Sequence, residues 1–339
     1  MDDYQRRVIN ARLNRSLIVT GCAGSGKSII ALWKAKEIQE KNMGTYIVIV
    51  FTKALRRYIS DGIKQIGINE RNVYYMNEWL DKQSPGADYI IVDEAQDFSK
   101  AKIEMFKAKA RRALMLFGDS AQQLYKFIKP PNNPISMYEI AGLTNFPMEN
   151  LVFNHRLPKT IARFAQYIIA ESDDLVDRCK QEGYEKPQII KRDSFEAQLD
   201  AVVEIIVNRK FEDVGILFMR NVQVQRAYDY FLKKHPEMLF EAKYNNDNEA
   251  NIGVGHMDIN FQTTNPKIIT YHSAKGLQFE AVFLPDCASN NKNPLYVAVT
   301  RTYQSLYILH SGNLSQVFDT IPTNCYDKEG QTSERILRI

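Results

Sequence analysis

The sequence is poor in cysteine and has no long hydrophobic run. Its four cysteines lie far apart, at Cys22, Cys179, Cys287 and Cys325. This spacing favours neither a zinc site nor a disulfide framework, so we expect a reducing compartment. The longest apolar run, Tyr46 to Phe51, is too short to cross a bilayer, and the first residues contain no apolar segment of a secretory signal. We therefore expect a cytoplasmic protein that does not enter a membrane.

A strong excess of charge of either sign is also missing. The formal net charge of +4 allows an anionic partner but falls short of the basic composition that is typical of a dedicated nucleic-acid-binding domain. With 45% hydrophobic and 25% charged residues among 339, the composition is that of a globular protein long enough for two cores. We expect two domains.

In the first part of the chain, short runs rich in Val, Ile and Leu alternate with helix-like segments. The predicted strands are Leu17 to Val19, Tyr46 to Phe51, Tyr89 to Val92 and Ala113 to Phe117. The predicted helices are Ser28 to Gln39, Lys53 to Lys64 and Ala101 to Lys109. This alternation predicts a parallel sheet covered on both faces. Lys129 to Pro134 interrupts the pattern with three prolines, and we place the domain boundary near Met148.

A second α/β alternation follows the boundary. Its predicted helices are Thr160 to Ala170, Ser194 to Arg209 and Val222 to Lys234. Its predicted strands are Gln188 to Ile190, Val214 to Phe218, Lys267 to Thr270, Ala281 to Leu284 and Ser305 to His310. Between them, the asparagine-rich segment Lys243 to Asn251 is predicted to be an exposed loop or hairpin.

The segment GCAGSGKS, from Gly21 to Ser28, satisfies the pattern G-x-x-x-x-G-K-[ST] and lies between a predicted strand and a predicted helix. The glycines allow backbone N–H groups to curl around a phosphate at a helix N-terminus. Lys27 supplies a point charge, and the Ser28 hydroxyl suits Mg²⁺. A chance glycine turn is the alternative, but it does not explain the flanking strand and helix. The predicted nucleotide-binding residues of this loop are Gly21, Gly24, Ser25, Gly26, Lys27 and Ser28.

Acidic residues end the third predicted strand, in the segment YIIVDEAQD. Open α/β sheets bind their ligands at the carboxyl ends of the strands. We predict that Asp93 holds Mg²⁺ and that Glu94 orients and deprotonates the attacking water. An acidic residue at a strand end is alternatively only a helix cap. Together with the phosphate loop, it predicts the second half of one ATP site.

The order of motifs along the chain resembles superfamily 1A helicases, the UvrD/Rep/PcrA family. The motifs that carry the resemblance are DEAQD at 93–97, GDSAQQLY at 118–125, NHR at 154–156, LFMRN at 217–221, TYHSAKGLQ at 270–278 and YVAVTR at 296–301. The resemblance implies an α/β protein of two tandem RecA-like P-loop NTPase domains with mainly parallel sheets, residues 1–148 and 149–339. It also implies ATP and Mg²⁺ as cofactors.

Within the ATP site, the resemblance implies that Gln5 reads the adenine edge and that Gln122 senses the terminal phosphate. Arg156 and Arg301 match the arginine fingers, so that closure of the two lobes would complete the catalytic site. Taken singly, each arginine is alternatively a surface ion-pair former.

Two positions that the resemblance places at the nucleotide depart from the family pattern. His155 stands where the family has a tyrosine that stacks on adenine, and Gln278 stands where it has a glutamate near the ribose. Imidazole can still stack and an amide can still bond a hydroxyl, so we expect ATP to bind with a changed preference for adenine.

The resemblance further implies single-strand contacts by six residues, and the aromatic ones would stack on bases. These residues are Phe51, Thr52, Tyr125, Phe127, Asn221 and His272. The alternatives are a buried aromatic pair at Tyr125 and Phe127 and a structural histidine at His272.

The gaps that hold accessory subdomains in the family are short here, about 35 and 45 residues, too few for a domain of typical size. The expected function is therefore that of a bare two-lobe motor, an ATP-dependent translocase on single-stranded nucleic acid. We expect 3′ to 5′ movement and DNA rather than RNA. The alternative is an ATP-driven switch subunit that recruits or licenses an effector such as a nuclease. A small-molecule kinase would leave the two arginine motifs unexplained.

Overall fold

The computed structural model describes residues 1–51, 53–120, 132–169, 174–245, 255–288, 291–312 and 314–329. The chain divides into two compact units, unit 1 from Met1 to Arg156 and unit 2 from Leu157 to Ile339. The predicted boundary lay at Met148. The division falls later because β6 (Met148–Leu151) pairs in parallel with β1 (Leu17–Gly21), so these residues belong to the first sheet.

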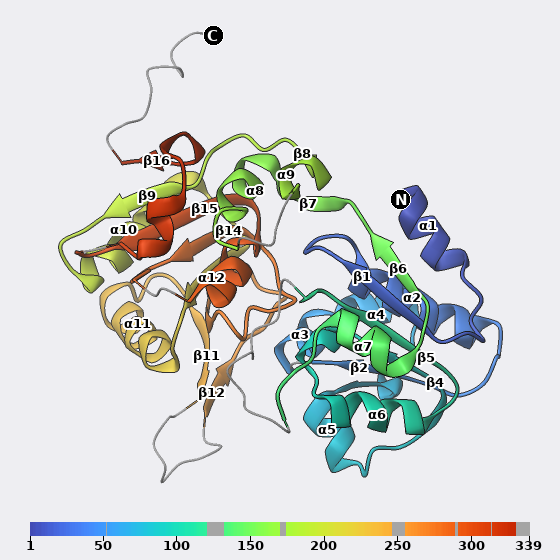
Figure 1. Ribbon diagram of the computed structural model, residues 1–339. Coiled ribbons are helices and arrows are strands. Elements are labelled where there is room, and N and C mark those ends of the chain that lie inside the picture. The colour runs from blue at the N-terminus through green and yellow to red at the C-terminus, as the bar shows by residue number, and fades with distance from the viewer. Residues whose placement is uncertain are drawn as a thin grey trace. The chain divides into compact units, whose positions relative to one another are not determined.

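Unit 1 contains a six-stranded sheet in the order β3-β2-β4-β5-β1-β6, in which every pairing of the described strands is parallel (Figure 1). Its other strands are β2 (Tyr46–Val50), β3 (Val73–Tyr75), β4 (Ala87–Val92) and β5 (Ala110–Gly118). Its helices are α1 (Asp3–Asn10), α2 (Lys27–Glu40), α3 (Lys53–Tyr58), α4 (Ser60–Ile66), α5 (Met76–Asp81), α6 (Lys100–Lys109) and α7 (Met137–Thr144), with 3₁₀ turns η1 (Glu70–Asn72) and η2 (Ala95–Asp97).

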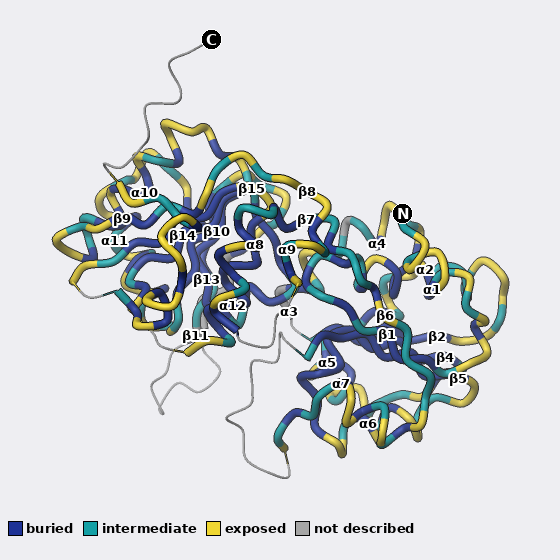
Figure 2. Tube along the Cα trace, turned by 45° about the horizontal axis from the view of Figure 1, so that its top comes forward, coloured by how far each residue is buried: buried dark blue, intermediate teal, exposed yellow. Residues whose placement is uncertain are grey.

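Both faces of this sheet are buried because successive strand residues point to opposite sides. In β1, Leu17 and Val19 belong to the core cluster that includes the buried residues of α2, whereas Ile18 belongs to the cluster with those of α5, α6 and α7. Figure 2 accordingly shows the strands as buried and the outer helix faces as exposed. The arrangement explains why these strands are continuous apolar runs.

The sheet of unit 2 has eight strands in the order β12-β11-β13-β10-β14-β15-β9-β16. Their bounds are β9 (Gln188–Lys191), β10 (Val214–Phe218), β11 (Glu241–Asn245), β12 (Gly255–Asp258), β13 (Lys267–Thr270), β14 (Phe279–Leu284), β15 (Thr302–His310) and β16 (Asp327–Lys328). Within the described part of this sheet, only β12 is antiparallel to its neighbour. The chain passes from unit 1 to unit 2 within β7 (Asn154–Pro158), which pairs with β8 (Cys179–Gln181).

The helices of unit 2 are α8 (Lys159–Ala165), α9 (Leu175–Arg178), α10 (Phe195–Arg209), α11 (Asn221–Lys234) and α12 (Lys292–Val299), with 3₁₀ turns η5 (Gln316–Thr320) and η6 (Thr323–Cys325). The buried residues of α10 and α11 share one core cluster with alternate residues of β10, β13, β14 and β15. Helix α12 contacts β14 and α8.

The α/β class with large parallel sheets is confirmed. The predicted helix from Lys53 to Lys64 is instead two helices, α3 and α4, and α4 runs on to Ile66. It ends there because Gly67 adopts a left-handed conformation, φ 81°, and its N–H bonds the carbonyls of Ile63 and Lys64. The segment from Lys243 begins in β11, and its residues 246–251 lie outside the described residues. No helix in the described part of the chain is long and apolar enough to span a membrane.

Candidate active site

Three neighbouring strands of unit 1 end at the same edge of the sheet. Strand β5 pairs in parallel with both β1 and β4. Strand β1 ends at Gly21, β4 at Val92 and β5 at Gly118. The segments that follow them are the phosphate loop, the acidic motif and the GD motif of the sequence. The fold therefore brings three separately predicted motifs to one edge, where open α/β sheets bind ligands.

The phosphate loop connects β1 to α2. Gly24 and Gly26 have φ of 76° and 89°, the left-handed region that favours glycine. The Nζ of Lys27 donates to the carbonyl oxygens of Gly21, at 2.7 Å, and Cys22, at 2.9 Å. The ammonium group thus lies against the inner side of the loop, where it can meet a phosphate.

The loop has a further feature that suits an anion. Ser25 is fully buried, and its Oγ has no hydrogen-bond partner within the described part of the chain. A buried polar atom of this kind calls for a ligand group or water. Because the loop leads into the N-terminus of α2, a phosphate is the group that the loop fits.

The acidic strand end meets the loop directly. Burial and the neighbouring Glu94 carboxylate raise the pKa of Asp93 to about 6, while a hydrogen bond to Ser28 and the charge of Lys27 oppose the rise. The predicted halves of the site therefore lie in contact. Within the described residues there is no group of three or more His, Cys, Asp or Glu side chains that could by itself hold a metal ion. The hydroxyl oxygen of Ser28 and a carboxylate oxygen of Asp93 fit Mg²⁺. At such sites Mg²⁺ takes its remaining ligands from phosphates and water.

Glu94 is buried and has a left-handed backbone conformation, φ 56°. Its Oε2 accepts a hydrogen bond of 2.6 Å from Nε2 of Gln96. The Gln96 Oε1 accepts from the backbone N–H of Asp119, at 2.9 Å. The sequence motifs indicated no separate role for Gln96, and the only signal for one was its place inside the DEAQD motif.

On the other side of the loop, Gln5 and His155 contact consecutive loop residues. The Gln5 Nε2 donates to the Ser25 carbonyl, at 3.0 Å, and the His155 backbone N–H donates to the Gly24 carbonyl, at 3.1 Å. Asp2 connects them, because it accepts from the Gln5 N–H, at 2.8 Å, and its Oδ2 lies 2.6 Å from His155 Nε2. Gln5 and His155, the two residues that the resemblance places at adenine, thus lie close together, and Asp2 contacts both of them.

The backbone and Cβ of Arg156 also lie beside the phosphate loop. A Cβ placed on Gly24 would lie 3.1 Å from the Cβ of Arg156 and 2.3 Å from Oδ1 of Asn154. The same Oδ1 accepts from the Arg156 backbone N–H, at 2.9 Å. The NHR motif is therefore packed against the phosphate loop within unit 1, while the role of the Arg156 guanidinium stays a prediction.

Arg301 belongs to unit 2 and is 3% exposed. Its Nε donates to the Val297 carbonyl, at 2.8 Å, and its Nη2 donates to Thr300 Oγ1, at 3.1 Å. Gln278 is also buried there. Their predicted parts in ATP binding and hydrolysis stay predictions.

The predicted strand contacts are partly described. Phe51 is half-buried and packs edge-on against Phe98, with ring centroids 5.3 Å apart. Asn221 begins α11. Burial and the charge of Lys275 lower the pKa of His272. Four predicted residues lie outside the described residues: Thr52, Gln122, Tyr125 and Phe127.

A parallel sheet with a phosphate loop after β1 and contacting acidic residues after β4 defines a P-loop nucleotide-binding fold. Two family models match the chain, an AAA domain over residues 5–128 and a UvrD-like helicase C-terminal domain over residues 267–309. Both matches agree with the resemblance of the motif series to UvrD-like helicases of superfamily 1. No curated protein sequence matches it.

The solved structures that match the chain include those of two proteins. The C-terminal domain of a possible DNA helicase from Lactobacillus plantarum WCFS1 has 17% identity and a TM-score of 0.39, over 51% of this chain and 98% of that one. Arterivirus nonstructural protein 10, a helicase, has 16% identity and a TM-score of 0.49, over 94% of this chain and 63% of that one. The same viral helicase, in complex with DNA, has 17% identity and a TM-score of 0.48, over 92% of this chain and 64% of that one. This chain thus spans less than two thirds of the viral protein.

Proposed function

We propose that this chain is an ATP-dependent motor that moves along single-stranded nucleic acid, DNA in preference to RNA, in the 3′ to 5′ direction. The observation that carries the proposal is the contact between the phosphate loop and Asp93, which makes one site from two motifs. The two family matches, one that spans this site and one within unit 2, support a helicase-like motor. The direction and the preference for DNA come from the resemblance of the motif series.

Hydrolysis would proceed by in-line attack of water on the terminal phosphorus, with the water proton passing to the Glu94 carboxylate. The bond from that phosphorus to the bridging oxygen would break, and ADP would leave with that oxygen. The loop backbone and the Lys27 ammonium would hold the phosphates and stabilise the developing charge. When bound, Mg²⁺ would be held by Ser28 and Asp93 and would supply further neutralisation of phosphate charge. Burial of Glu94 keeps its carboxylate away from bulk water.

An ATP-driven switch that licenses an effector is the second candidate. One observation favours it: the two stretches where the family holds accessory subdomains form helices and strands of the units themselves. Residues after Phe51 form α3, α4, β3 and α5 of unit 1, and residues after Asn221 form α11, β11 and β12 of unit 2. Displacement of streptavidin from the end of a biotinylated strand tests for movement. Its absence, with ATP-dependent binding of an effector protein, would favour the switch.

Two substitutions test the ATP site, and an exposed lysine provides the control. We expect Lys27→Ala to lose ATP binding and turnover, whereas Glu94→Gln should bind a fluorescent ATP analogue normally and lose turnover by about 100-fold or more. Lys41→Ala, which removes an exposed ion pair with Glu37, should match the wild type. Normal turnover in Lys27→Ala or Glu94→Gln would refute the assignments.

A further inference from the structure

We propose that Gln96 is a positioning residue that couples the water-activating carboxylate of Glu94 to the end of β5, and through it to the binding of the strand. The inference rests on the proposed function and adds a means of regulation to the same site. It arises from two hydrogen bonds within unit 1. Gln96 lies in η2, is fully buried, and touches a different motif with each end of its amide.

The two ends of the amide cannot be exchanged. The backbone N–H of Asp119 can only donate, so the amide oxygen of Gln96 has to face it, at 2.9 Å. The amide nitrogen then faces Glu94 and donates to its Oε2, at 2.6 Å. A flipped amide would place N–H against N–H and oxygen against a carboxylate oxygen. The position of the Asp119 backbone therefore determines the direction from which Glu94 is held.

The two hydrogen bonds of Gln96, to Glu94 and to the Asp119 N–H, form a bridge between these residues. This bridge packs tightly against the last residue of β5. A Cβ added to Gly118 would lie 2.4 Å from Oε1 of Gln96 and 2.4 Å from Sδ of Met137, distances that real side chains do not allow. The absence of a side chain at Gly118 thus lets the amide reach the Asp119 N–H. Because the contact is this close, a small displacement of the end of β5 must also displace Gln96.

Glu94 is sensitive to such a displacement. Its left-handed backbone, φ 56°, is unfavourable for a residue with a Cβ and persists because the surroundings fix it. One carboxylate oxygen is held by Gln96, which determines where the other can point. In sequence, Asp119 leads directly into the predicted phosphate sensor and base-contacting residues at 122–127. Strand binding at that segment would move Asp119, and Gln96 would pass the movement to Glu94, so that ATP turnover responds to the strand.

The test compares Gln96→Met, which keeps the side-chain length without polar atoms, with Gln96→Glu, which keeps the acceptor for Asp119 but cannot donate to Glu94 while ionised. The control is Gln39→Met, because the Oε1 of Gln39 also accepts from a backbone N–H, that of Asn69, and Gln39 lies outside the site. Each variant is assayed for affinity for a fluorescent ATP analogue, for affinity for labelled oligo(dT), and for kcat and KM with and without oligo(dT).

We expect both Gln96 variants to bind ATP and oligo(dT) within about twofold of the wild type while kcat with the strand falls about tenfold or more. Gly118→Ala, which displaces the amide, should show the same split between kcat and KM. Gln39→Met should be unchanged. The inference is overturned if kcat with the strand stays within twofold of the wild type in both Gln96 variants, or if kcat falls only in parallel with ATP affinity, as a general loss of structure would cause.

Amide hydrogen exchange separates this inference from the proposed function. If the strand stimulates no turnover in the wild-type protein, the proposed motor fails, but the bridge can still be examined. The Asp119 amide should exchange faster in Gln96→Met than in the wild type and at the wild-type rate in Gln39→Met. Unchanged exchange at Asp119 in Gln96→Met would show that the bridge does not exist in solution and would overturn the inference.

Discussion

The phosphate loop is shaped by residues that have no side chain at the points of closest approach. Gly24 combines a left-handed backbone with close packing against Asn154 and Arg156. Gly67 has a similar backbone, φ 81°, but a Cβ placed there would meet no atom within 4 Å. These two glycines allow the cost of the backbone conformation to be separated from the cost of the contact.

Replacement by alanine at each position uses this difference. We expect Gly24→Ala and Gly67→Ala each to lower the free energy of unfolding by about 1–2 kcal/mol through backbone strain. Only Gly24→Ala should also weaken binding of a fluorescent ATP analogue, because it displaces Asn154 and the start of Arg156. Equal ATP affinity in the two variants would show that ATP binding does not depend on the contact between Gly24 and the NHR motif.

A half-buried carboxyl group in unit 2 gives a pH-dependent prediction. Burial raises the pKa of Asp213 from 3.8 to about 6, against the opposing effects of the Tyr303 hydroxyl and the Lys267 ammonium. The folded state therefore holds this proton more tightly than the unfolded state, and stability decreases as pH rises from about 4 to about 6.

Asp213→Asn removes this effect, since the amide is neutral at every pH. Its free energy of unfolding relative to the wild type should increase between pH 4.5 and pH 7.5, by less than about 3 kcal/mol. Chemical denaturation at the two pH values measures the change, with the exposed Asp319→Asn as control. A relative stability that does not change with pH would contradict the raised pKa.

At this scale, the sequence predicted which local motifs meet, and the roles of their residues stay predictions. The spacing from Gly21 to Ser28 and the strand before Asp93 are visible in the sequence, and the structure places them in contact. Asp2 escaped notice because its partner His155 is 153 residues away, and such a pairing arises only in the folded chain. The role of Gln96 likewise depends on a backbone N–H supplied by β5.

Among the elements, apolar runs on parallel strands were the most predictable, because both faces of these strands are buried. Short elements stabilised by caps were missed. Helix α1 has one buried residue, Val8, and is held by a capping box in which Asp2 and Gln5 bond each other's backbone N–H groups. The pattern D-x-x-Q was a visible signal for this helix start. Strand β6, MENL, has a single buried residue, Leu151, and carried no alternating pattern to predict it.

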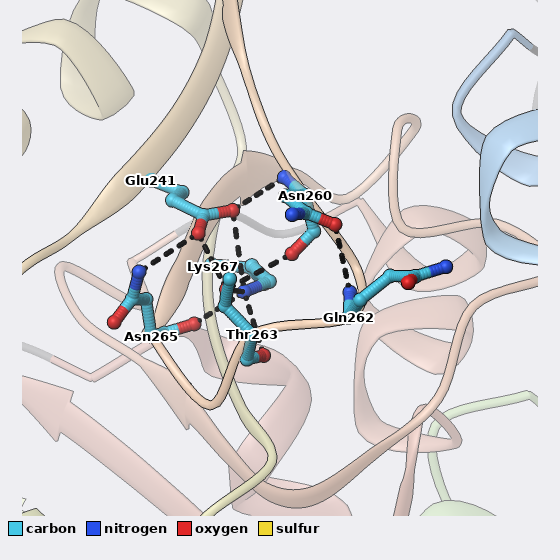
Figure 3. Close-up of polar contacts among 6 residues, drawn as sticks. All are labelled: Glu241, Asn260, Gln262, Thr263, Asn265 and Lys267. Atoms are coloured by element: carbon cyan, nitrogen blue, oxygen red, sulfur yellow. Dashed lines mark hydrogen bonds and ion pairs between the residues drawn. The ribbon is translucent and has the colours of Figure 1, made fainter.

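A buried polar network joins the starts of β11 and β13 in unit 2 (Figure 3). The Glu241 carboxylate accepts from the Asn260 N–H, the Thr263 hydroxyl and the Asn265 amide, and lies 3.3 Å from the Lys267 Nζ. Lys267 also donates to the carbonyls of Thr263 and Asn265. These bonds fix the segment between β12 and β13 to the sheet.

The network predicts an order of effects on stability. Glu241→Met leaves three donors without their acceptor and removes the negative charge beside the buried Lys267 ammonium, which should cost about 3–5 kcal/mol. Lys267→Met should cost less, because Glu241 keeps its three other donors. Lys41→Met, at an exposed pair, should change the free energy of unfolding by about 0.5 kcal/mol or less. Unfolding in urea measures all three, and a loss in Glu241→Met no larger than that of Lys41→Met would contradict the network's role.

For the whole molecule, the two-unit organisation was predicted, but the exact limit of unit 1 depends on contacts that the sequence does not show. Leu151 is 2% exposed within the core of unit 1, and residues 154–156 contact the phosphate loop. The segment MENL follows Pro147 and has apolar residues only at its two ends, so no sequence pattern assigned it to the first sheet.

The two limits can be compared as fragments. We expect residues 1–156 to bind a fluorescent ATP analogue, because every described contact of the phosphate loop lies within them. The fragment 1–148 should unfold at a lower temperature by losing most of β6 and the buried Leu151, a side chain whose burial is worth about 1.5–3 kcal/mol. Equal melting temperatures and ATP affinities in the two fragments would contradict the division at Arg156.

Steady-state ATP hydrolysis is the most direct test of the central claim that ATP turnover is driven by a single strand. Rates are measured without polymer and with single-stranded DNA, single-stranded RNA or duplex DNA, each at two salt concentrations. The account predicts that single-stranded DNA raises kcat most, and that the strand concentration for half-maximal stimulation increases steeply with salt because phosphate contacts release counterions. A rate that is the same with and without every polymer at both salt concentrations would contradict it.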